Sequence, residues 1–475
     1  MEKKPNRQQL ACDFIFENYM QFRRLRFDTI TQKVQICDAL AHPSVSLTDP
    51  TLPAHWRYLT NADINTMVCD CSSATGIHIT AREIITVLNA GNSYIPHIHP
   101  LREYILSLKP YTSDQPDWID LVARQVHVKA NDQMGDKNIA SGTGEYIYQQ
   151  LETSNKNNSL PLGCVVPQRN VVENNVVVNN TPADALWRAC FKKWFVAMVA
   201  SWMRDDIVNH QVLVLIGKQG IYKTTWLEHL IPPHLRDYCC KLANATQLSK
   251  DDRLRIAEFG LINLDELDAM TPRELNVMKS VITASDVNER VAYGYTKERR
   301  VRLASFCGSS NRREFLTDIT GNRRWMPFEV EAIQNPFFTT LPYDLMYAQA
   351  WALVNDPTYS YWLELEEIAV LEEHNETFRA QDSEEQLLPI LFDIPAEGKG
   401  EFMTTAQISE RLVTFGNIKK PMAVSRLGTL LGAAGYKSVT RGSRGARVRG
   451  WIVYHRDTNE INANKTLLAK ECVTM

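Results

Sequence analysis

The stretch Val212-Leu-Val-Leu-Ile216, followed by Gly217-Lys-Gln-Gly220-Ile-Tyr-Lys223-Thr224-Thr225, decides the fold. Five apolar residues in a row are typical of a buried strand, and the helical segment after the turn stops at Pro232-Pro233. The turn follows the template G-x-x-x-x-G-K-[ST], in which backbone N–H groups surround phosphate at a helix N-terminus. The stretch therefore predicts a buried strand, a phosphate-binding loop and a helix.

One position departs from the template, because Tyr222 stands where the second glycine is expected. A side chain there could crowd the phosphate unless the backbone avoids positive φ, although Gly220 can supply flexibility two residues earlier. Lys223 is expected to reach the β and γ phosphates, and the Thr224 hydroxyl to bind Mg²⁺. Taken alone, the stretch could also be an ordinary strand, turn and helix. The predicted nucleotide-binding residues are Gly217, Gly220, Tyr222, Lys223, Thr224 and Thr225.

Two further apolar runs end in polar residues. The run 259–264 leads into Asp265 and Glu266, where the first carboxylate can hold Mg²⁺ through water and the second can polarise an attacking water. The run 301–307 leads to Asn311, which is placed to orient that water. Because short apolar runs alternate with helical patterns from 211 to 330, the sequence predicts a parallel α/β sheet with an NTP site.

Two arginines, Arg323 and Arg324, follow a turn in Thr320-Gly-Asn-Arg-Arg-Trp325. A planar guanidinium donates two hydrogen bonds to phosphate, so such a pair suits a nucleotide site. The predicted catalytic residues are Lys223, Asp265, Glu266, Asn311, Arg323 and Arg324, with Thr224 and Asp265 as metal ligands.

Residues from about 185 to 330 resemble the virulence-associated protein E family, which is related to superfamily 3 helicases and occurs on phages, plasmids and integrated elements. The motifs that carry the resemblance are Gly217–Thr224, Leu264-Asp-Glu, Gly308-Ser-Ser-Asn and Asp318-Ile-Thr-Gly-Asn-Arg-Arg-Trp. The resemblance implies an AAA+-like P-loop NTPase core that forms a ring, expected to be a hexamer. It places ATP and Mg²⁺ between subunits, with Arg323 or Arg324 reaching the neighbour's nucleotide.

This resemblance implies an ATP-dependent DNA helicase, translocase or replication initiator of a mobile element. A nucleotide-regulated DNA-binding protein without productive unwinding is the main alternative, and Tyr222 favours it. An assembly protein in which ATP only locks the ring is a second alternative.

Residues 285–302 alternate in the manner of a hairpin around Gly294. In superfamily 3 rings a hairpin at this location grips single-stranded DNA in the pore, which makes Lys297, Arg299 and Arg300 candidate DNA contacts, with Tyr293 or Tyr295 stacking on bases. Alternatively, Arg290 and Arg302 serve only to pair with Asp286, Glu289 or nucleotide.

The net charge of −3 hides an uneven distribution. Residues 364–397 hold eleven acidic residues against Arg379, whereas residues 401–456 hold ten Lys and Arg against two Glu, which is 10 − 2 = +8. The predicted order in 401–456 is helix, helix, strand, Arg-rich turn and strand, which is similar to a winged helix that binds DNA. A solvated face, or a contact with the acidic segment, is the alternative. The predicted DNA contacts here are Arg426, Arg441, Arg444, Arg447 and Arg449.

The predicted organisation has six parts. They are a mainly helical module (1–150), an Asn-rich linker (151–182), the ATPase core (183–335), a helical acidic segment (336–400), the winged-helix-like domain (401–456) and a tail (457–475). In the first part we expect a hairpin over 22–37 and helices starting at the Thr80/Glu83 capping box and near 101–108 and 118–128. A core helix is expected over 186–203.

No run approaches the ~20 apolar residues of a bilayer span, and the charged opening residues predict no secretory signal. The ten cysteines are scattered without a Cys-x-x-Cys pair. These features predict reduced thiols in a cytoplasmic protein without a membrane partner. His97 and His99 could be metal ligands, but the flanking prolines favour a turn.

Overall fold

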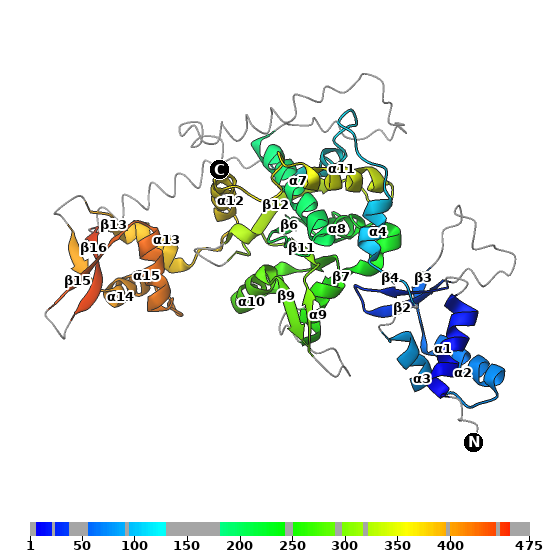
Figure 1. The fold of residues 1–475 in the computed structure, drawn as a ribbon. Coiled ribbons are helices and arrows are strands. Elements are labelled where there is room, and N and C mark those ends of the chain that lie inside the picture. The colour runs from blue at the N-terminus through cyan, green and yellow to red at the C-terminus, as the bar shows by residue number, and fades with distance from the viewer. Residues whose placement is uncertain are drawn as a thin grey trace. The chain divides into compact units, whose positions relative to one another are not determined.

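The structure is a computed structural model, and it describes residues 6–20, 24–37, 56–90, 95–129, 181–242, 250–289, 297–316, 322–395, 400–442 and 447–456 (Figure 1). The chain divides into two compact units. The first comprises Met1–Asn311 and Phe328–Glu364, and the second comprises Arg312–Pro327 and Leu365–Met475. Among the described helices, none combines the length and hydropathy needed to cross a bilayer.

A six-stranded sheet in the order β5-β12-β6-β11-β8-β7 forms the centre of the first unit. Its strands are β5 (Val126–Val128), β6 (Val212–Ile216), β7 (Cys239–Leu242), β8 (Leu261–Leu264), β11 (Ser305–Ser310) and β12 (Trp325–Ile333). Strands β6, β11, β8 and β7 pair in parallel, and β5 joins β12 antiparallel. Every residue of β6, β8 and β11 is buried, which matches the apolar runs in the sequence. The predicted parallel α/β sheet is confirmed.

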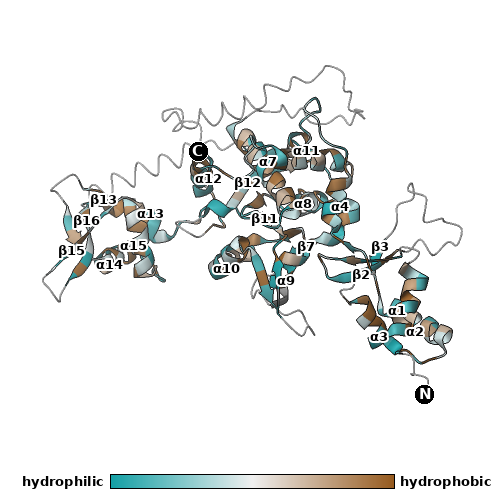
Figure 2. Ribbon diagram, in the orientation of Figure 1, coloured by the Kyte–Doolittle hydropathy of each residue, from teal (hydrophilic) through white to brown (hydrophobic). Residues whose placement is uncertain are grey.

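The long helix α7 (Pro182–Met203) packs on this sheet, and α11 (Tyr343–Asn355) packs against α7. Figure 2 shows hydrophobic residues, in brown, as well as hydrophilic residues, in teal, on both helices. Three buried indoles of α7 donate hydrogen bonds: Trp187 to the Ala123 carbonyl, Trp194 to that of Phe306 and Trp202 to that of Gly260. The predicted core helix is therefore confirmed, and its tryptophans both fill the core and satisfy carbonyls of neighbouring elements.

The N-terminal part contains a small sheet in the order β3-β2-β1-β4. Strands β1 (Leu25–Asp28) and β2 (Lys33–Cys37) form the antiparallel hairpin that the sequence predicts. The remaining elements are α1 (Arg7–Ile15), η1 (Phe16–Met20), β3 (Trp56–Tyr58), α2 (Asn61–Thr75), α3 (Ala81–Leu88) and β4 (His97–Ile98). The Thr80/Glu83 capping box opens α3 as predicted.

Asp28 connects this small sheet to the central one. Its buried carboxylate accepts hydrogen bonds from the hydroxyls of Thr31, Tyr58 and Tyr238, at 2.8, 2.9 and 2.7 Å. Tyr238 ends η3 (Pro233–Tyr238), which leads directly into β7. Burial and the nearby Asp28 carboxylate raise the pKa of Tyr238, so the phenol stays protonated and donates.

The helices predicted near 101–108 and 118–128 are α4 (Pro100–Ser107) and α5 (Trp118–Ala123). The second helix is shorter than predicted because Val126–Val128 pairs with β12 instead of continuing the helix. Both helices contact α7. Residues 100–128 thus pack against α7 and join the central sheet through β5.

The second unit begins with Arg312–Pro327 held against α12 (Leu365–Glu376). The buried Asn375 amide donates to the carbonyls of Asn322 and Trp325, and a ring nitrogen of His374 lies 2.7 Å from the Pro327 carbonyl. The Arg379 guanidinium pairs with Glu376 and Glu385, so the acidic stretch partly neutralises its own arginine.

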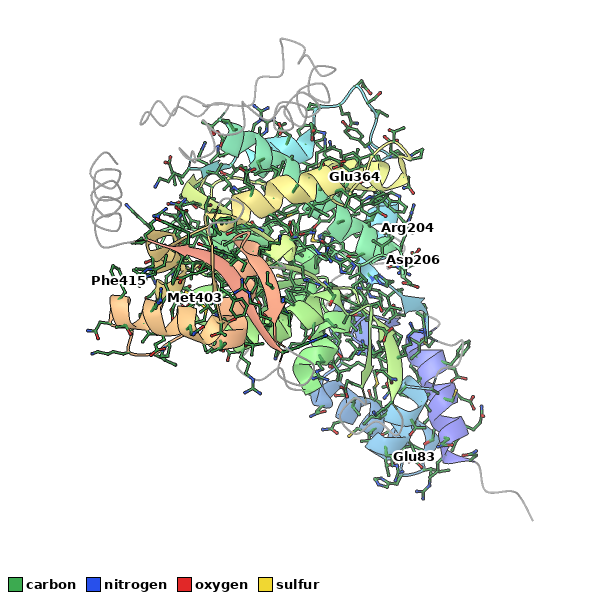
Figure 3. The ribbon with its side chains drawn as sticks, turned by 90° about the vertical axis from the view of Figure 1, so that its left-hand side faces the viewer. Glu83, Arg204, Asp206, Glu364, Met403 and Phe415 are labelled. Atoms are coloured by element: carbon green, nitrogen blue, oxygen red, sulfur yellow. The ribbon has the colours of Figure 1, made fainter. Side chains whose placement is uncertain are left out.

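The remaining elements of the second unit surround one hydrophobic core. In order they are α13 (Ser383–Leu391), β13 (Phe392–Asp393), β14 (Glu401–Met403), α14 (Thr405–Gly416), α15 (Val424–Ala433), β15 (Lys437–Arg441) and β16 (Val448–His455). Strands β14 and β15 each pair antiparallel with β16. Met403 on β14 and Phe415 near the end of α14 are labelled in Figure 3. The predicted order of two helices and two strands is confirmed.

Strands β9 (Asp286–Glu289) and β10 (Glu298–Val301) form the antiparallel hairpin predicted in the first unit. Its tip, including Arg290, Tyr293 and Tyr295, lies outside the described residues. The hairpin follows α10 (Pro272–Thr283) and precedes β11, so its base adjoins the central sheet.

Arg302 fixes the base of this hairpin. Its side chain is 1% exposed, and it donates to the carbonyls of Ile282 and Ala284 at the C-terminal end of α10. It also donates to Ala304, just before β11, at 2.9 Å and to Asn209, just before β6, at 2.8 Å. Burial lowers the pKa of this guanidinium, and the negative end of the helix dipole favours its charge. Arg302 therefore joins three elements through backbone carbonyls.

Replacing Arg302 by Met should lower the free energy of unfolding by about 3–5 kcal/mol, because each buried carbonyl left without a donor costs about 1–3 kcal/mol. Lysine should also destabilise, since it lacks the planar fork. Urea unfolding followed by tryptophan fluorescence measures both. Arg299→Met is the control on the same hairpin: the Arg299 side chain is 75% exposed and pairs with Asp286, and such pairs contribute about 1 kcal/mol or less. Equal stability of the two Met variants would contradict the role of Arg302.

Candidate functional site

The loop between β6 and α8 (Lys223–His229) runs over residues 217–222. Gly217 is required by a close approach, because a Cβ atom there would lie 2.6 Å from the Val330 carbonyl oxygen. Gly220 adopts φ +87°, in the left-handed region that favours glycine. The two glycines of the stretch therefore allow the chain to turn tightly into the N-terminus of α8.

Tyr222 adopts the left-handed conformation that the template reserves for glycine. Its φ is +68°, and it precedes the first residue of α8. The phenol oxygen accepts a hydrogen bond from the Asn335 amide at 3.3 Å, and the ring packs edge-on against Phe337 at 6.3 Å between centroids. The loop thus keeps the backbone shape of the glycine template despite the side chain, whose ring is held by the segment after β12.

Lys223 turns its ammonium back into the loop. The Nζ donates to the carbonyls of Gly217 and Lys218, both at 2.8 Å, and to the Asn311 side-chain oxygen at 3.2 Å. Burial lowers the pKa of Lys223, and the carboxylates of Asp268 and Asp265 oppose part of that shift. A cation surrounded by loop carbonyls and amide oxygen can exchange these partners for an oxyanion.

Asp265 lies at the centre of the site, at the carboxyl end of β8. One carboxylate oxygen accepts from the Thr224 hydroxyl at 2.9 Å and the Ser309 hydroxyl at 2.8 Å, and the other lies 2.6 Å from Lys241 Nζ. Burial alone would raise the pKa of Asp265, but the hydrogen bonds from Lys241, Ser309 and Thr224 outweigh it, so the carboxylate stays ionised. The structure thus brings together Thr224 and Asp265, which the sequence paired as metal ligands.

Glu266 and Asn311 lie at the same edge of the sheet. Glu266 has φ +55° and an exposed side chain, and Asn311 directly follows β11. The backbone N–H of Asn311 donates to the Asp268 carboxylate at 3.3 Å. Thr225 lies in the first turn of α8, where its carbonyl is 2.7 Å from a ring nitrogen of His229.

Three residues of the site are not among the site residues that the sequence predicts: Lys241, Asp268 and Ser309. The strand pairing explains the position of Ser309. Gly308 of β11 lies opposite Leu264 of β8, so the next residues, Ser309 and Asp265, lie side by side at the ends of the two strands. Lys241 carries no such signal, because a lone lysine on a short strand is usually solvated.

The other predicted catalytic and hairpin residues belong to other elements of the chain. Arg323 and Arg324 form η5 (Asn322–Arg324) in the second unit. Lys297 and Arg299 are exposed on the hairpin, whereas Arg300 is 10% exposed, pairs with Glu258 at 2.8 Å and donates to the Ile30 carbonyl. This placement gives Arg300 a structural role.

The basic residues of the second unit fall into two groups. Arg426 and Arg456 pair with Asp382 and Asp393 of the acidic segment, at 2.6 and 2.7 Å. By contrast, the strand ends around the β15–β16 turn carry exposed arginines. They are Arg441, which lies over the Phe402 ring, Arg447, and Arg449, which donates to Ser438; Arg444 is outside the described residues.

The His97 and His99 pair has local partners. The His97 ring stacks on Phe27 at 4.7 Å, and His99 accepts from the Arg102 N–H at the start of α4. Burial lowers the pKa of His99 to about 4, so it is neutral at physiological pH. Across the described residues, no three His, Cys, Asp or Glu side chains gather into a metal site.

Residues 168–380 match the family model of the virulence-associated protein E-like domain. Over these residues the chain is similar to this family. This match spans the loop, Asp265, Asn311 and the two arginines, and it confirms the resemblance seen in the sequence.

Solved structures of the C terminal region of NrS-1 are also similar. One A form apo structure has 10% identity and a TM-score of 0.40, covering 90% of this chain and 96% of that one. A second, of residues 305–718, has 11% identity and a TM-score of 0.38, covering 95% and 100%. No curated protein matches the sequence.

Substitution of Tyr222 tests whether its positive φ strains the backbone of this loop. Tyr222→Gly and Tyr222→Ala both remove the ring, but only glycine tolerates φ +68° without cost. We expect the Gly variant to be more stable than the Ala variant by about 1 kcal/mol, because a left-handed L-residue costs about 1–2 kcal/mol. Thermal unfolding measures the order. Val277, inside α10, is the control, where Ala should be the more stable residue. The same order at both positions would contradict strain at Tyr222.

Proposed function

We propose that this protein is an ATP-dependent DNA motor or replication initiator of a mobile genetic element. Its core would be a P-loop NTPase of the AAA+ type that acts as a ring. The observation that carries the proposal is the hydrogen bond of 2.9 Å between Thr224 and Asp265, residues 41 positions apart. It joins the end of the glycine loop to the end of a second buried strand, as an NTP site requires.

The strand order supports this core. In the order β12-β6-β11-β8-β7, the strand before the loop lies between β12 and β11, and β11 separates it from the strand that bears Asp265. Ligands of such open sheets bind at the carboxyl ends of the strands. The loop, Asp265 and Asn311 all lie at these ends. Backbone N–H groups of the loop would bind the phosphates, and Lys223 would exchange its loop carbonyls for β and γ phosphate oxygens.

The residues present fit a Mg²⁺ ion. Thr224 and Asp265 offer the hydroxyl and carboxylate oxygens that this hard cation prefers, and Ser309 offers a third oxygen beside them. The Lys241 ammonium already lies at the same carboxylate, which supports a site for positive charge there. When bound, the ion would neutralise charge on the phosphate oxygens.

Glu266 and Asn311 would act on the attacking water. The exposed Glu266 carboxylate can accept its proton, and the Asn311 side chain, which contacts Lys223 at 3.2 Å, can orient it beside the γ phosphate. In the ring, Arg323 or Arg324 would stabilise the developing charge on the neighbour's nucleotide. Lys297 and Arg299 on the hairpin would contact single-stranded DNA in the pore.

The C-terminal module would bind DNA as a winged helix. Supporting this, α13, β14, α14, α15, β15 and β16 follow one another, with β16 between β14 and β15. The turn between the last two strands would be the wing. Since Arg426 pairs with Asp382, the contact with the acidic segment competes with DNA for that residue, whereas the wing arginines offer the main phosphate contacts.

DNA-stimulated ATP hydrolysis tests the core. Lys223→Ala and Glu266→Gln should each lower the rate by about 100-fold or more, the usual contribution of a general base or charged group in such a site. Only Lys223→Ala should also weaken nucleotide binding, since Glu266 acts on water. Glu331→Gln, an exposed carboxylate on β12, is the charge-matched control. Full activity of both variants would remove the site assignment.

A second candidate is a nucleotide-regulated DNA-binding protein without unwinding, favoured by Tyr222 in the loop. A forked-duplex strand-displacement assay separates the two functions. Hydrolysis with strand displacement supports the motor, and nucleotide-dependent DNA binding without displacement supports the regulator.

The wing arginines provide the test of DNA binding. The variant with Arg441, Arg447 and Arg449 replaced by Ala should bind DNA at least about 10-fold more weakly. For this variant, the slope of log affinity against log salt concentration should become less steep by about 0.7–0.9 for each phosphate that is no longer neutralised. Near-UV circular dichroism checks that the module stays folded. Arg411→Ala, on α14 and paired with Glu401 at 3.3 Å, is the control. An unchanged salt slope in the triple variant would exclude the wing.

A further inference from the structure

Lys241 forms a close ion pair that the proposed hydrolysis does not use. Its Nζ lies 2.6 Å from one oxygen of Asp265, while the other oxygen accepts from Thr224 and Ser309. The Asp265 side chain is 17% exposed and that of Lys241 is 47% exposed. Both oxygens of the central carboxylate are therefore engaged, one of them by a full positive charge.

The location of Lys241 explains how this ion pair can be reversible. It lies on β7, the edge strand of the sheet, and its residue is exposed. Four methylene groups carry the ammonium, so it can leave the carboxylate by side-chain rotation without moving the strand. In contrast, Thr224 and Ser309 reach Asp265 through short side chains from less exposed positions of the site. The cation is thus the movable partner of this carboxylate.

We propose that Lys241 is a built-in counter-cation of the nucleotide site, which neutralises Asp265 while no divalent cation is present and competes with the divalent cation for that carboxylate. The inference rests on the proposed nucleotide site. It adds that competition from Lys241, together with the ligands Thr224 and Asp265, sets the affinity of the site for a divalent cation.

This competition predicts that Lys241 has opposite effects on nucleotide binding without and with a divalent cation. Without a divalent cation, the ammonium reduces repulsion between the Asp265 carboxylate and the nucleotide triphosphate. With a divalent cation, the same ammonium occupies an oxygen that the hydrated cation needs and repels it. Removing the charge should therefore weaken metal-free binding and strengthen metal-dependent binding. A lysine that only stabilised the fold, or that bound phosphate directly, would affect both in the same direction.

Binding of a fluorescent ATP analogue to the full chain measures both constants, first in EDTA and then in a Mg²⁺ titration. For Lys241→Gln, the dissociation constant in EDTA should rise about threefold to tenfold, as expected for removal of one partly exposed charge. The Mg²⁺ concentration for half-maximal binding should fall by about the same factor. Lys241→Arg should keep both values near the wild type, because it retains the charge.

Lys129→Gln is a matched control. It removes the same charge from a pair with Glu329, at 3.4 Å, beside β5 on the opposite edge of the same sheet. The inference is overturned if the wild type binds the analogue but Lys241→Gln leaves both constants unchanged or shifts them in the same direction. If the wild type binds the analogue neither in EDTA nor with Mg²⁺, the proposed nucleotide site itself is overturned.

Discussion

The parallel register of β6, β11 and β8 is the constraint on which the candidate site depends. Because these strands are buried along their whole length, their polar residues can appear only where each strand ends. Pairing of Ser310 with Ile216 and of Gly308 with Leu264 aligns those ends at one edge. Three segments far apart in the chain thereby bring the hydroxyls of Thr224 and Ser309 within hydrogen-bonding distance of the Asp265 carboxylate. A slip of one residue in the β11–β8 pairing would separate Ser309 from Asp265, and a slip in either pairing would separate Thr224 from Asp265.

The parts of this arrangement that follow from local pattern could be predicted from the sequence. Continuous apolar runs predicted the buried strands, and the glycine loop with Asp265 predicted the main site, since polar residues after buried strands share an edge. The contacts of long side chains could not be predicted in this way. Lys241 reaches Asp265 from another strand, and nothing in its immediate neighbours marks it. The end of α5 was also missed, because only pairing with β12 makes Val126–Val128 a strand.

Residue type alone also does not show which basic residues are buried in the structure and which are exposed. Residue type alone leaves the hairpin arginines as either DNA contacts or ion pairs, but strand alternation separates them. Arg300 lies opposite the buried Val287 and therefore faces inward, whereas Arg299 lies opposite Asn288 and faces solvent. Arg302 repeats the inward face two residues later and donates its hydrogen bonds to carbonyls within the described part of the chain. A basic run on a strand is thus divided into structural and exposed residues by its period of two.

The buried Arg302 also relates the hairpin to the candidate site. Its guanidinium holds the carbonyls of Ala304 and Asn209, which lie just before β11 and β6, together with the end of α10. Those two strands end at Asn311 and at the glycine loop. The base of the hairpin and the start of both strands are therefore one hydrogen-bonded body, in a core too closely packed to deform gradually. In a motor of the proposed kind, the base of the hairpin would therefore move together with the sheet as a whole.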